Sequence, residues 1–295
     1  MVEFFITIIY DPIKNTAMSN PDINLFRDEE FEEVKLTPEK VVCLGMEFES
    51  DDARRTYFRE ELRKKLPELR QIEGFPIGED EDIINLSDPP YYTACPNPWL
   101  NDFVAEWEKE KIELERQGKR SAEFEVNEPY ASDVSEGKNN PVYTAHTYHT
   151  KVPHPAIMRY ILHYTQPGDI IFDGFAGTGM TGSAAAACSN DSDDVAYRIN
   201  SEWMKNYGKK PNWGVRHAIC GDLSPYATNI AYFYNTPINI NALKREVERI
   251  KREMENECAW MYTTTNSAGK PTGRINFIVW SDIMVCSNCG QEYVF

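Results

Sequence analysis

Three glycines stand between a short apolar run and a run of small residues. The sequence DGFAGTGMTG, residues 173–182, follows IIF and is followed by SAAAAC. Gly177, Gly179 and Gly182 fit the spacing G-x-G-x-x-G, in which glycine allows a tight turn and lets a ligand approach the backbone without meeting a Cβ atom. No lysine stands where a phosphate loop requires one. The spacing predicts a nucleotide-like cofactor where a strand passes into a helix.

Two cofactor classes use this strand, loop and helix. A dinucleotide needs an acidic residue at the end of the next strand, and S-adenosylmethionine also needs a carboxylate there for its ribose hydroxyls. Asp222, which ends VRHAICGD at residues 215–222, is the candidate in both cases. It lies farther from Gly182 than is usual, and the polar insertion 189–214 accounts for this if it loops out before the strand. The loop alone leaves both cofactors open.

A second group of chemically capable residues is Asp88-Pro89-Pro90-Tyr91, within IINLSDPPYYTACPNPW at residues 83–99. One interpretation is a plain turn, because Asp-Pro ends strands and Pro-Pro cannot donate to a ladder. The other is a site, in which two prolines hold a carboxylate, a backbone carbonyl and a flat ring rigidly.

That arrangement suits methylation of an exocyclic amine. Such an amine is a poor nucleophile because its lone pair is delocalised into the ring. Asp88 and a carbonyl of the proline pair can accept its two N–H bonds, which favours a tetrahedral nitrogen through positioning and electrostatics. Tyr91 can stack on a base withdrawn from the duplex. Tyr92 is as well explained as a packed core residue.

The two motifs together resemble the amino-group DNA methyltransferases in the beta order, with the catalytic motif first. YHTKVPHPAIMRYILHYTQPGDIIFDGFAGTGMTG, residues 148–182, and ICGDLSPYATNIA, residues 219–231, are similar to that family's helix, strand, glycine loop and next acidic strand end. The resemblance covers 81–99 and 147–234. Gly174 stands where the family usually has proline.

The resemblance implies an S-adenosylmethionine-dependent enzyme that acts on DNA. Asp rather than Ser before Pro-Pro-Tyr favours adenine N6 over cytosine N4, and a restriction-modification setting follows by family association. The implied fold is a Rossmann-like α/β sheet with crossover helices, complete or incomplete in this chain. The implied catalytic residues are Asp88, Pro89, Pro90 and Tyr91, and the implied cofactor-binding residues are His154, Asp173, Phe175, Ala176, Gly177, Thr178, Gly179 and Asp222.

IVWSDIMVCSNCG, residues 278–290, is similar to the start of a zinc ribbon found in some adenine-specific DNA methylases. Cys286 and Cys289 have zinc-knuckle spacing, but a ribbon needs two such pairs. Zinc is therefore expected only in a longer parent protein, with a free thiol pair as the alternative. His146, His149 and His154 lie near the helix predicted at 154–165, at spacings that could suit a metal site, but they are expected to be surface or turn residues.

The elements that must position these residues follow from periodicity. Helices are predicted at 51–69, 101–117, 154–165, 183–188, 224–234 and 241–262, the last with its Met and aromatic residues in the core. Strands are predicted at 81–87, at 169–173 with full burial, at 215–222 and at 274–280. The alternation after residue 154 favours an open α/β sheet with its ligand at the carboxyl edge. We expect an N-terminal extension at 1–80, a methyltransferase domain at 81–285 and a ribbon-like segment at 286–295.

Composition constrains the function loosely. The 295 residues are 41% hydrophobic and 26% charged, and no apolar run could span a membrane. The net charge of -16 argues against a large nucleic-acid surface, although a local basic groove is compatible with it. The odd number of cysteines, seven, suits the reducing cytoplasm. FFITIIY at 4–10 does not fit a signal peptide, and RDEEFEE at 27–33 is expected to be a solvated arm.

Two other functions stay open from the sequence. The enzyme could act on RNA or on a protein glutamine, which related sites also methylate. Alternatively, the chain could be a cofactor-binding fragment or subunit. It would then need a protein partner or a downstream polypeptide for the remaining strands and for DNA recognition, because 99–150 is too short to hold them.

Overall fold

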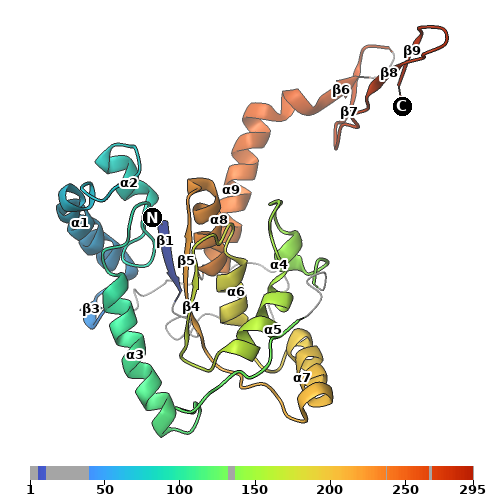
Figure 1. The fold of residues 1–295 in the computed structure, drawn as a ribbon. Coiled ribbons are helices and arrows are strands. Elements are labelled where there is room, and N and C mark those ends of the chain that lie inside the picture. The colour runs from blue at the N-terminus through green and yellow to red at the C-terminus, as the bar shows by residue number, and fades with distance from the viewer. Residues whose placement is uncertain (1–5, 11–39, 132–136, 237, 266–267, 295) are drawn as a thin grey trace. The chain divides into compact units, whose positions relative to one another are not determined.

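The computed structural model describes residues 6–10, 40–131, 137–236, 238–265 and 268–294 (Figure 1). The chain divides into two compact units, Met1–Pro237 and Ile238–Phe295. No helix within the described ranges is long and apolar enough to cross a membrane. The acidic run at 27–33 lies outside the described residues, and the expected domain boundaries near 80 and 285 stay predictions.

The first unit is built around a three-stranded sheet in the order β1-β5-β4 (Figure 1). Strand β4 (Ile170–Asp173) runs parallel to β5 (His217–Asp222), with Asp173 opposite Cys220, and β1 (Ile6–Tyr10) pairs antiparallel with β5. The strands predicted at 169–173 and 215–222 are thus present. The mixture of helices and strands is compatible with an α/β fold, but the described residues form only small sheets and no clear Rossmann-like sheet.

The predicted full burial of β4 is wrong, because three of its residues are half-buried and Phe172 is 63% exposed. The reason is topological: β4 is the last strand in the order β1-β5-β4, so among the described residues it has a neighbouring strand on one side only. Strand β5, which has neighbours on both sides, is almost entirely buried.

Helices surround this sheet at nearly all of the predicted positions. Ser50, Asp193 and Ser224 each cap a helix by accepting a hydrogen bond from the backbone amide three residues on. A small hairpin, β2 (Val41–Cys43) and β3 (Met46–Phe48), precedes the first helix. The helices are α1 (Asp51–Leu69), α2 (Asp80–Leu86), α3 (Leu100–Arg116), α4 (Pro141–Thr144), α5 (His154–Tyr164), α6 (Met180–Ala187), α7 (Asp194–Tyr207) and α8 (Pro225–Asn235).

Two segments differ from the sequence prediction. The strand predicted at 81–87 is helix α2, which begins with the acidic residues Asp80, Glu81 and Asp82; negative charge there is favourable near the helix N-terminus. A short apolar run does not by itself distinguish a buried strand from a buried helix. The insertion 189–214 does not simply loop out, because it contains α7, which buries an apolar face.

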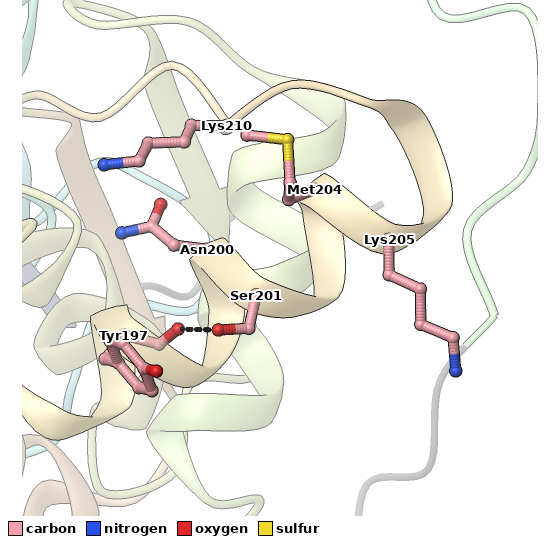
Figure 2. A pocket seen from close by; sticks show the side chains of 6 residues that line it. All are labelled: Tyr197, Asn200, Ser201, Met204, Lys205 and Lys210. Carbon is pink, nitrogen blue, oxygen red and sulfur yellow. Dashed lines mark hydrogen bonds between the residues drawn. The ribbon is translucent and has the colours of Figure 1, made fainter.

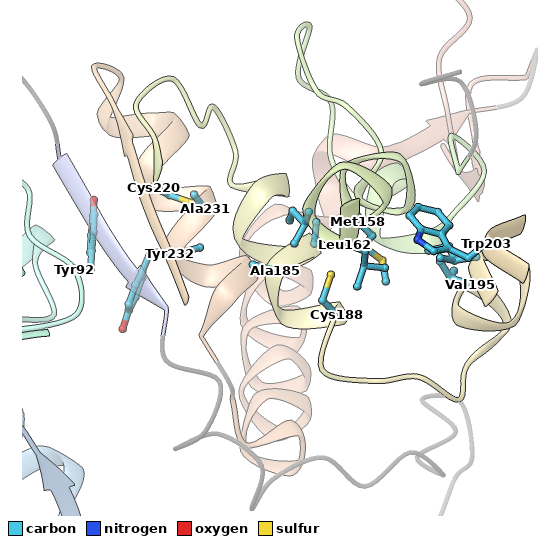
Figure 3. Packing of buried hydrophobic residues seen from close by; sticks show 14 residues of the cluster. Tyr92, Met158, Leu162, Ala185, Cys188, Val195, Trp203, Cys220, Ala231 and Tyr232 are labelled. Atoms are coloured by element: carbon cyan, nitrogen blue, oxygen red, sulfur yellow. The ribbon is translucent and has the colours of Figure 1, made fainter. Parts of the chain in front are cut away.

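Two hydrophobic cores lie against opposite faces of β5. Ala218 and Cys220 belong to a core with residues of α5, α6, α7 and α8 (Figure 3), whereas Ile219 belongs to a core with residues of α1, α2 and α3. Successive side chains of a strand point to opposite faces, so β5 separates the helices around the glycine loop from those around residues 83–99. His217 extends the second face, where its ring stacks on Trp107 at 4.4 Å between centroids.

The second unit consists of one helix and two hairpins. Helix α9 (Ile240–Cys258) continues into a 3-10 helix (Ala259–Tyr262), followed by the pairs β6 (Thr263–Thr265) with β7 (Pro271–Arg274) and β8 (Ile283–Val285) with β9 (Glu292–Val294). The strand predicted at 274–280 is wrong, since β7 ends at Arg274. The predicted core position of the Met and aromatic residues in 241–262 is also wrong, because all four are at least 47% exposed: Met254, Trp260, Met261 and Tyr262.

A substitution at Gly179 can test how closely the glycine loop packs against α8. It has φ +78°, and an added Cβ would lie 2.6 Å from Ala231 Cβ on α8. We expect Gly179→Ala to lower the free energy of unfolding by about 2 to 4 kcal/mol, from backbone strain and overpacking together. Urea unfolding followed by circular dichroism measures this.

Gly208→Ala is the matched control. Gly208 also has positive φ, +68°, but an added Cβ meets nothing within 4 Å. It should therefore lose only about 1 to 2 kcal/mol from the backbone. Equal losses in the two variants would contradict close packing of the loop on α8.

Candidate active site

The turn at Asp88-Pro89-Pro90-Tyr91 is closed by its own backbone. Asp88 and Tyr92 exchange two backbone hydrogen bonds of 2.9 and 3.0 Å. Just before it, the Ser87 hydroxyl donates to the Ile83 carbonyl and accepts from the Ala94 amide. These contacts fix the turn to the end of α2, so the rigid presentation predicted from the prolines has a helix rather than a strand behind it.

The Asp88 carboxylate is buried, with only 5% of the residue exposed. Its Oδ1 accepts a hydrogen bond of 3.0 Å from Arg54 Nη2. Its Oδ2 accepts one from the Tyr232 hydroxyl and lies 3.5 Å from Arg55 Nη2. Arg54 also donates from Nη1 to the Pro89 carbonyl at 2.7 Å. One arginine thus contacts both acceptors that the sequence assigned to a target amine.

The donors around Asp88 keep their protons. Burial lowers the pKa of Arg54, but hydrogen bonds and charge from Asp51 and Asp88 outweigh it and raise that pKa above its ordinary value. Burial raises the pKa of Tyr232, and the negative charge of Asp88 raises it further. At neutral pH the guanidinium is charged and the tyrosine is an O–H donor.

The two tyrosines of the motif differ in environment. The Tyr91 ring is partly exposed, and Arg54 Cζ lies 5.0 Å from its centroid. Tyr92 is 2% exposed and stacks on Tyr232 at 4.9 Å between centroids, as Figure 3 shows. The core role that the sequence left open for Tyr92 is therefore the observed one. The Pro90 carbonyl accepts from Asn97 Nδ2 at 2.7 Å, so the two proline carbonyls have different partners.

The glycine loop meets Asp222 at the carboxyl ends of β4 and β5. Gly177 N donates to Asp222 Oδ2 at 2.9 Å, and Asp222 Oδ1 accepts from Ser224 N at 2.9 Å. Ala176 N donates to the Gly221 carbonyl. The structure thus brings together the loop and the carboxylate that the sequence paired across the long insertion.

Other predicted cofactor residues lie in and near this loop. Asp173 accepts from Phe175 N at 3.1 Å and from Thr181 Oγ1 at 2.6 Å, while the Phe175 side chain is 83% exposed. Thr178 is buried, and its Oγ1 has no hydrogen-bond partner among the described residues.

His154, at the start of α5, is predicted to contact the cofactor. It is buried, and burial lowers the pKa of its imidazole although the charge of Asp193 acts in the opposite direction. Its Nδ1 has no hydrogen-bond partner within the described part of the chain. The role predicted for His154 in cofactor binding stays a prediction.

Four side chains at these sites were missed by sequence reasoning. Arg54, Arg55 and Tyr232 contact Asp88 from α1 and α8, and a Cβ added to Gly177 would lie 3.0 Å from the Tyr148 ring. Tyr148 stands in YHTKVPHP, which belongs to the family-like segment, so a signal existed for it. Arg54 and Tyr232 are distant from Asp88 in sequence, and no local pattern links them to it.

Helix α8 connects the two candidate motifs. Tyr232 donates to Asp88, while the preceding residue, Ala231, packs under Gly179. Asn235 on the same helix donates to the Gly179 carbonyl. No described residue of the glycine loop contributes a hydrogen bond to the Asp88 side chain, so the two motifs are joined through α8 rather than by direct bonds at Asp88.

A surface hollow of about 480 Å³ lies elsewhere, along α7 (Figure 2). It shares no residue with either motif. Figure 2 shows side chains that come from one face of α7 and from the segment after it, and the lining residues are Tyr197, Asn200, Ser201, Met204, Lys205 and Lys210. The hollow is therefore not part of the candidate active site.

The cysteine pair lies in the β8–β9 hairpin. Cys286 exchanges backbone hydrogen bonds with Gln291 and Gly290, which gives the turn its shape. Within the described residues, no group of three or more His, Cys, Asp or Glu side chains could hold a metal ion. The metal role predicted for Cys286 and Cys289 is therefore not supported. His146 Nδ1 lies 2.9 Å from the Tyr234 hydroxyl.

The cysteines should differ strongly in reactivity. Burial raises the pKa of Cys95, Cys188 and Cys220 to about 12, whereas hydrogen bonds from Cys289 lower that of Cys286. Because the thiolate is the nucleophile, iodoacetamide at pH 7 should label Cys286 first and the three buried thiols only after unfolding. Peptide mass spectrometry measures this, and Cys286→Ser should remove the fastest phase. Fast labelling of Cys220 in the folded chain would contradict it.

Comparison with protein families identifies a match. A family model of the N6/N4 type, described as DNA methylase, matches residues 79–232. Neither the curated proteins nor the solved structures contain a match. The matched range includes the Asp88 turn, the glycine loop, Asp222 and Tyr232, and it is more than half of the chain. This protein therefore belongs to the DNA methylase family, whose members transfer methyl groups to bases of DNA.

Proposed function

We propose that this chain binds S-adenosylmethionine at the glycine loop and directs its methyl group to adenine N6 in DNA. Membership of the DNA methylase family supports methyl transfer to DNA bases, and that family generally uses this cofactor. The observation that carries the proposal is the hydrogen bond from Gly177 N to Asp222, which fixes a carboxylate beside a glycine loop at the carboxyl edge of the sheet.

The residues at this edge fit the cofactor. Gly177 leaves space that a Cβ would fill, with the Tyr148 ring 3.0 Å from that position. Thr178 carries a buried hydroxyl that has no partner among the described residues. Asp222 is partly exposed and would accept bonds from the ribose hydroxyls. When bound, S-adenosylmethionine supplies an electrophilic methyl group on sulfur.

The chain's own residues would prepare the amine. Asp88 and the Pro89 carbonyl are two acceptors on one rigid turn, and they would take the two N–H bonds of an exocyclic amine. This localises the nitrogen lone pair that must attack the methyl carbon. Tyr91 would stack on the flipped base, a contact worth about 1 to 3 kcal/mol.

Adenine is proposed over cytosine because aspartate, rather than serine, precedes Pro-Pro-Tyr. The alternatives from the sequence, RNA and a protein glutamine, share the same amine chemistry and are separated by assay. The net charge of -16 favours a separate source of basic DNA-binding surface, supplied by a partner or by further polypeptide.

Asp222 and Gly177 test the cofactor site. Asp222→Asn should weaken binding of S-adenosylmethionine about 10-fold or more, since a charge-assisted bond to ribose is lost. Gly177→Val should abolish binding, because its side chain would collide with Tyr148 at a positive φ. Calorimetry with the cofactor and its demethylated product measures both.

Asp191→Asn, at an exposed aspartate outside both motifs, is the control and should bind as the wild type does. Tight binding of NADH without binding of S-adenosylmethionine would rule out the proposed cofactor.

Asp88 tests the catalytic assignment. Asp88→Ala should lower methyl transfer about 100-fold or more and leave cofactor affinity nearly unchanged, because Asp88 would contact the amine and not the cofactor. Transfer of tritiated methyl to unmethylated DNA, RNA and protein measures both the role and the substrate class.

Asp82→Asn, on the exposed side of α2, should keep wild-type transfer. Thermal melting checks that Asp88→Ala is folded, because it leaves Arg54 without one of its charge partners. Unchanged transfer in Asp88→Ala would remove Asp88 from the mechanism.

A further inference from the structure

Arg54 contacts all three groups that the proposed function assigns to the target base. Its Nη1 donates to the Pro89 carbonyl at 2.7 Å, and its Nη2 donates to Asp88 Oδ1 at 3.0 Å. Its Cζ lies 5.0 Å from the centroid of the Tyr91 ring. The two acceptors and the stacking surface are therefore engaged by one side chain of α1.

A guanidinium has the chemistry needed to imitate the edge of a base. It is planar, carries only N–H donors and lies readily over an aromatic face. The exocyclic amine of a base likewise presents two N–H donors in the plane of a flat group. Arg54 matches the exocyclic amine in the number of N–H donors, in their acceptors and in the contact with the ring. It differs from the amine in that its two donors are on different nitrogens.

Because the site is buried, the Arg54 guanidinium and a target base cannot occupy it at the same time. Arg54 is 1% exposed and Asp88 is 5% exposed, and Pro89 is buried as well. A base cannot reach either acceptor while the guanidinium fills the space beside them, because protein interiors are close-packed.

We propose that Arg54 closes the target-base site in the free protein and must withdraw before a base can enter. This inference rests on the proposed function, because it takes Asp88, the Pro89 carbonyl and Tyr91 as the groups that receive the base. Arg54 is thus a gating residue rather than a catalytic residue.

Asp51 holds the gate closed from outside the site. Its Oδ1 accepts a bond of 2.8 Å from Arg54 Nε, and its Oδ2 accepts one of 2.7 Å from Arg55 Nε. The Asp51 side chain is 48% exposed, so it contacts solvent while its partner is buried. Asp51 is not one of the groups assigned to the target base, so a substitution there alters the support of Arg54 and Arg55 and leaves Asp88, Pro89 and Tyr91 in the chain.

Opening requires movement of little more than one turn of α1. Arg54 lies in the first turn, which Ser50 caps, whereas Phe58, Leu62 and Leu66 anchor the following turns in the core. If only a fraction of molecules has Arg54 withdrawn, the apparent dissociation constant for a base rises by the inverse of that fraction. Loosening the gate should therefore raise base affinity.

The test is equilibrium dialysis of the 295-residue chain, with saturating demethylated cofactor, against radiolabelled deoxyadenosine. Asp51→Asn and Arg54→Met are the test variants, and Asp52→Asn is the matched control. Asp52 lies in the same turn and is exposed, and its backbone carbonyl accepts a hydrogen bond from the Thr56 hydroxyl. N6,N6-Dimethyldeoxyadenosine is the control ligand, because it lacks both N–H donors.

We expect Asp51→Asn and Arg54→Met to bind deoxyadenosine about 3- to 10-fold more tightly than the wild type, and Asp52→Asn to bind as the wild type does. The dimethylated ligand should show no gain in any variant. A purely structural role for Arg54 would move melting temperature but would not create this dependence on the N–H donors.

Two results would overturn the proposal that Arg54 closes the base site. One is wild-type affinity as high as that of the variants, and the other is unchanged or weaker binding in Asp51→Asn while it melts normally and binds cofactor. If Arg54→Met does not fold, Asp51→Asn decides. Failure of the proposed function is distinct, because the wild type would then bind no S-adenosylmethionine.

Discussion

The buried carboxylate of Asp88 is the constraint on which the first unit depends. A charge removed from water is costly unless charged or hydrogen-bonding partners surround it, and removing one partner of such a pair is strongly destabilising. Asp88 meets this requirement with Arg54, Arg55 and Tyr232, which come from α1 and α8. One side chain thereby fixes the motif turn against two helices that are far apart in the sequence.

The position of α8 follows from the same requirement. Tyr232 must reach Asp88, which places the preceding Ala231 against Gly179, and the glycine has no side chain to obstruct this packing. The loop can then close on Asp222, at the end of the strand that leads into α8. Strand β5 carries a core on each face, so the two halves of the site share one strand and one helix.

The proposed cofactor site and the proposed base site differ in whether their binding groups are already engaged by other side chains. On the cofactor side, the loop is folded onto Asp222, and Gly177 provides an open backbone. On the base side, both acceptors are engaged by a protonated arginine and lie beneath the surface. Under the proposed function, a base could reach Asp88 and the Pro89 carbonyl only after Arg54 is displaced, whereas Gly177 and Asp222 need no such displacement of an arginine. Such an order would keep a reactive pair of acceptors shielded until DNA is bound.

The sequence by itself determined the local features of this protein. The glycine spacing, Asp222 at the end of a strand, the rigid proline turn and most helices follow from residue types within a few positions of one another, because caps, turns and periodicity act locally. The prediction from sequence was wrong for 81–87, where a short apolar run suits either a helix or a strand. It was also wrong for the Met and aromatic residues of 241–262, whose burial depends on what packs against them.

Only the tertiary structure decided which distant side chains meet. Arg54 on Asp88 and Pro89, Tyr232 on Asp88, and Tyr148 against Gly177 join segments between 29 and 144 positions apart, and no local pattern encodes such pairs. They arise because a buried carboxylate and a closely packed loop need partners, and the packing of helices on β5 determines which residues are near enough to provide them.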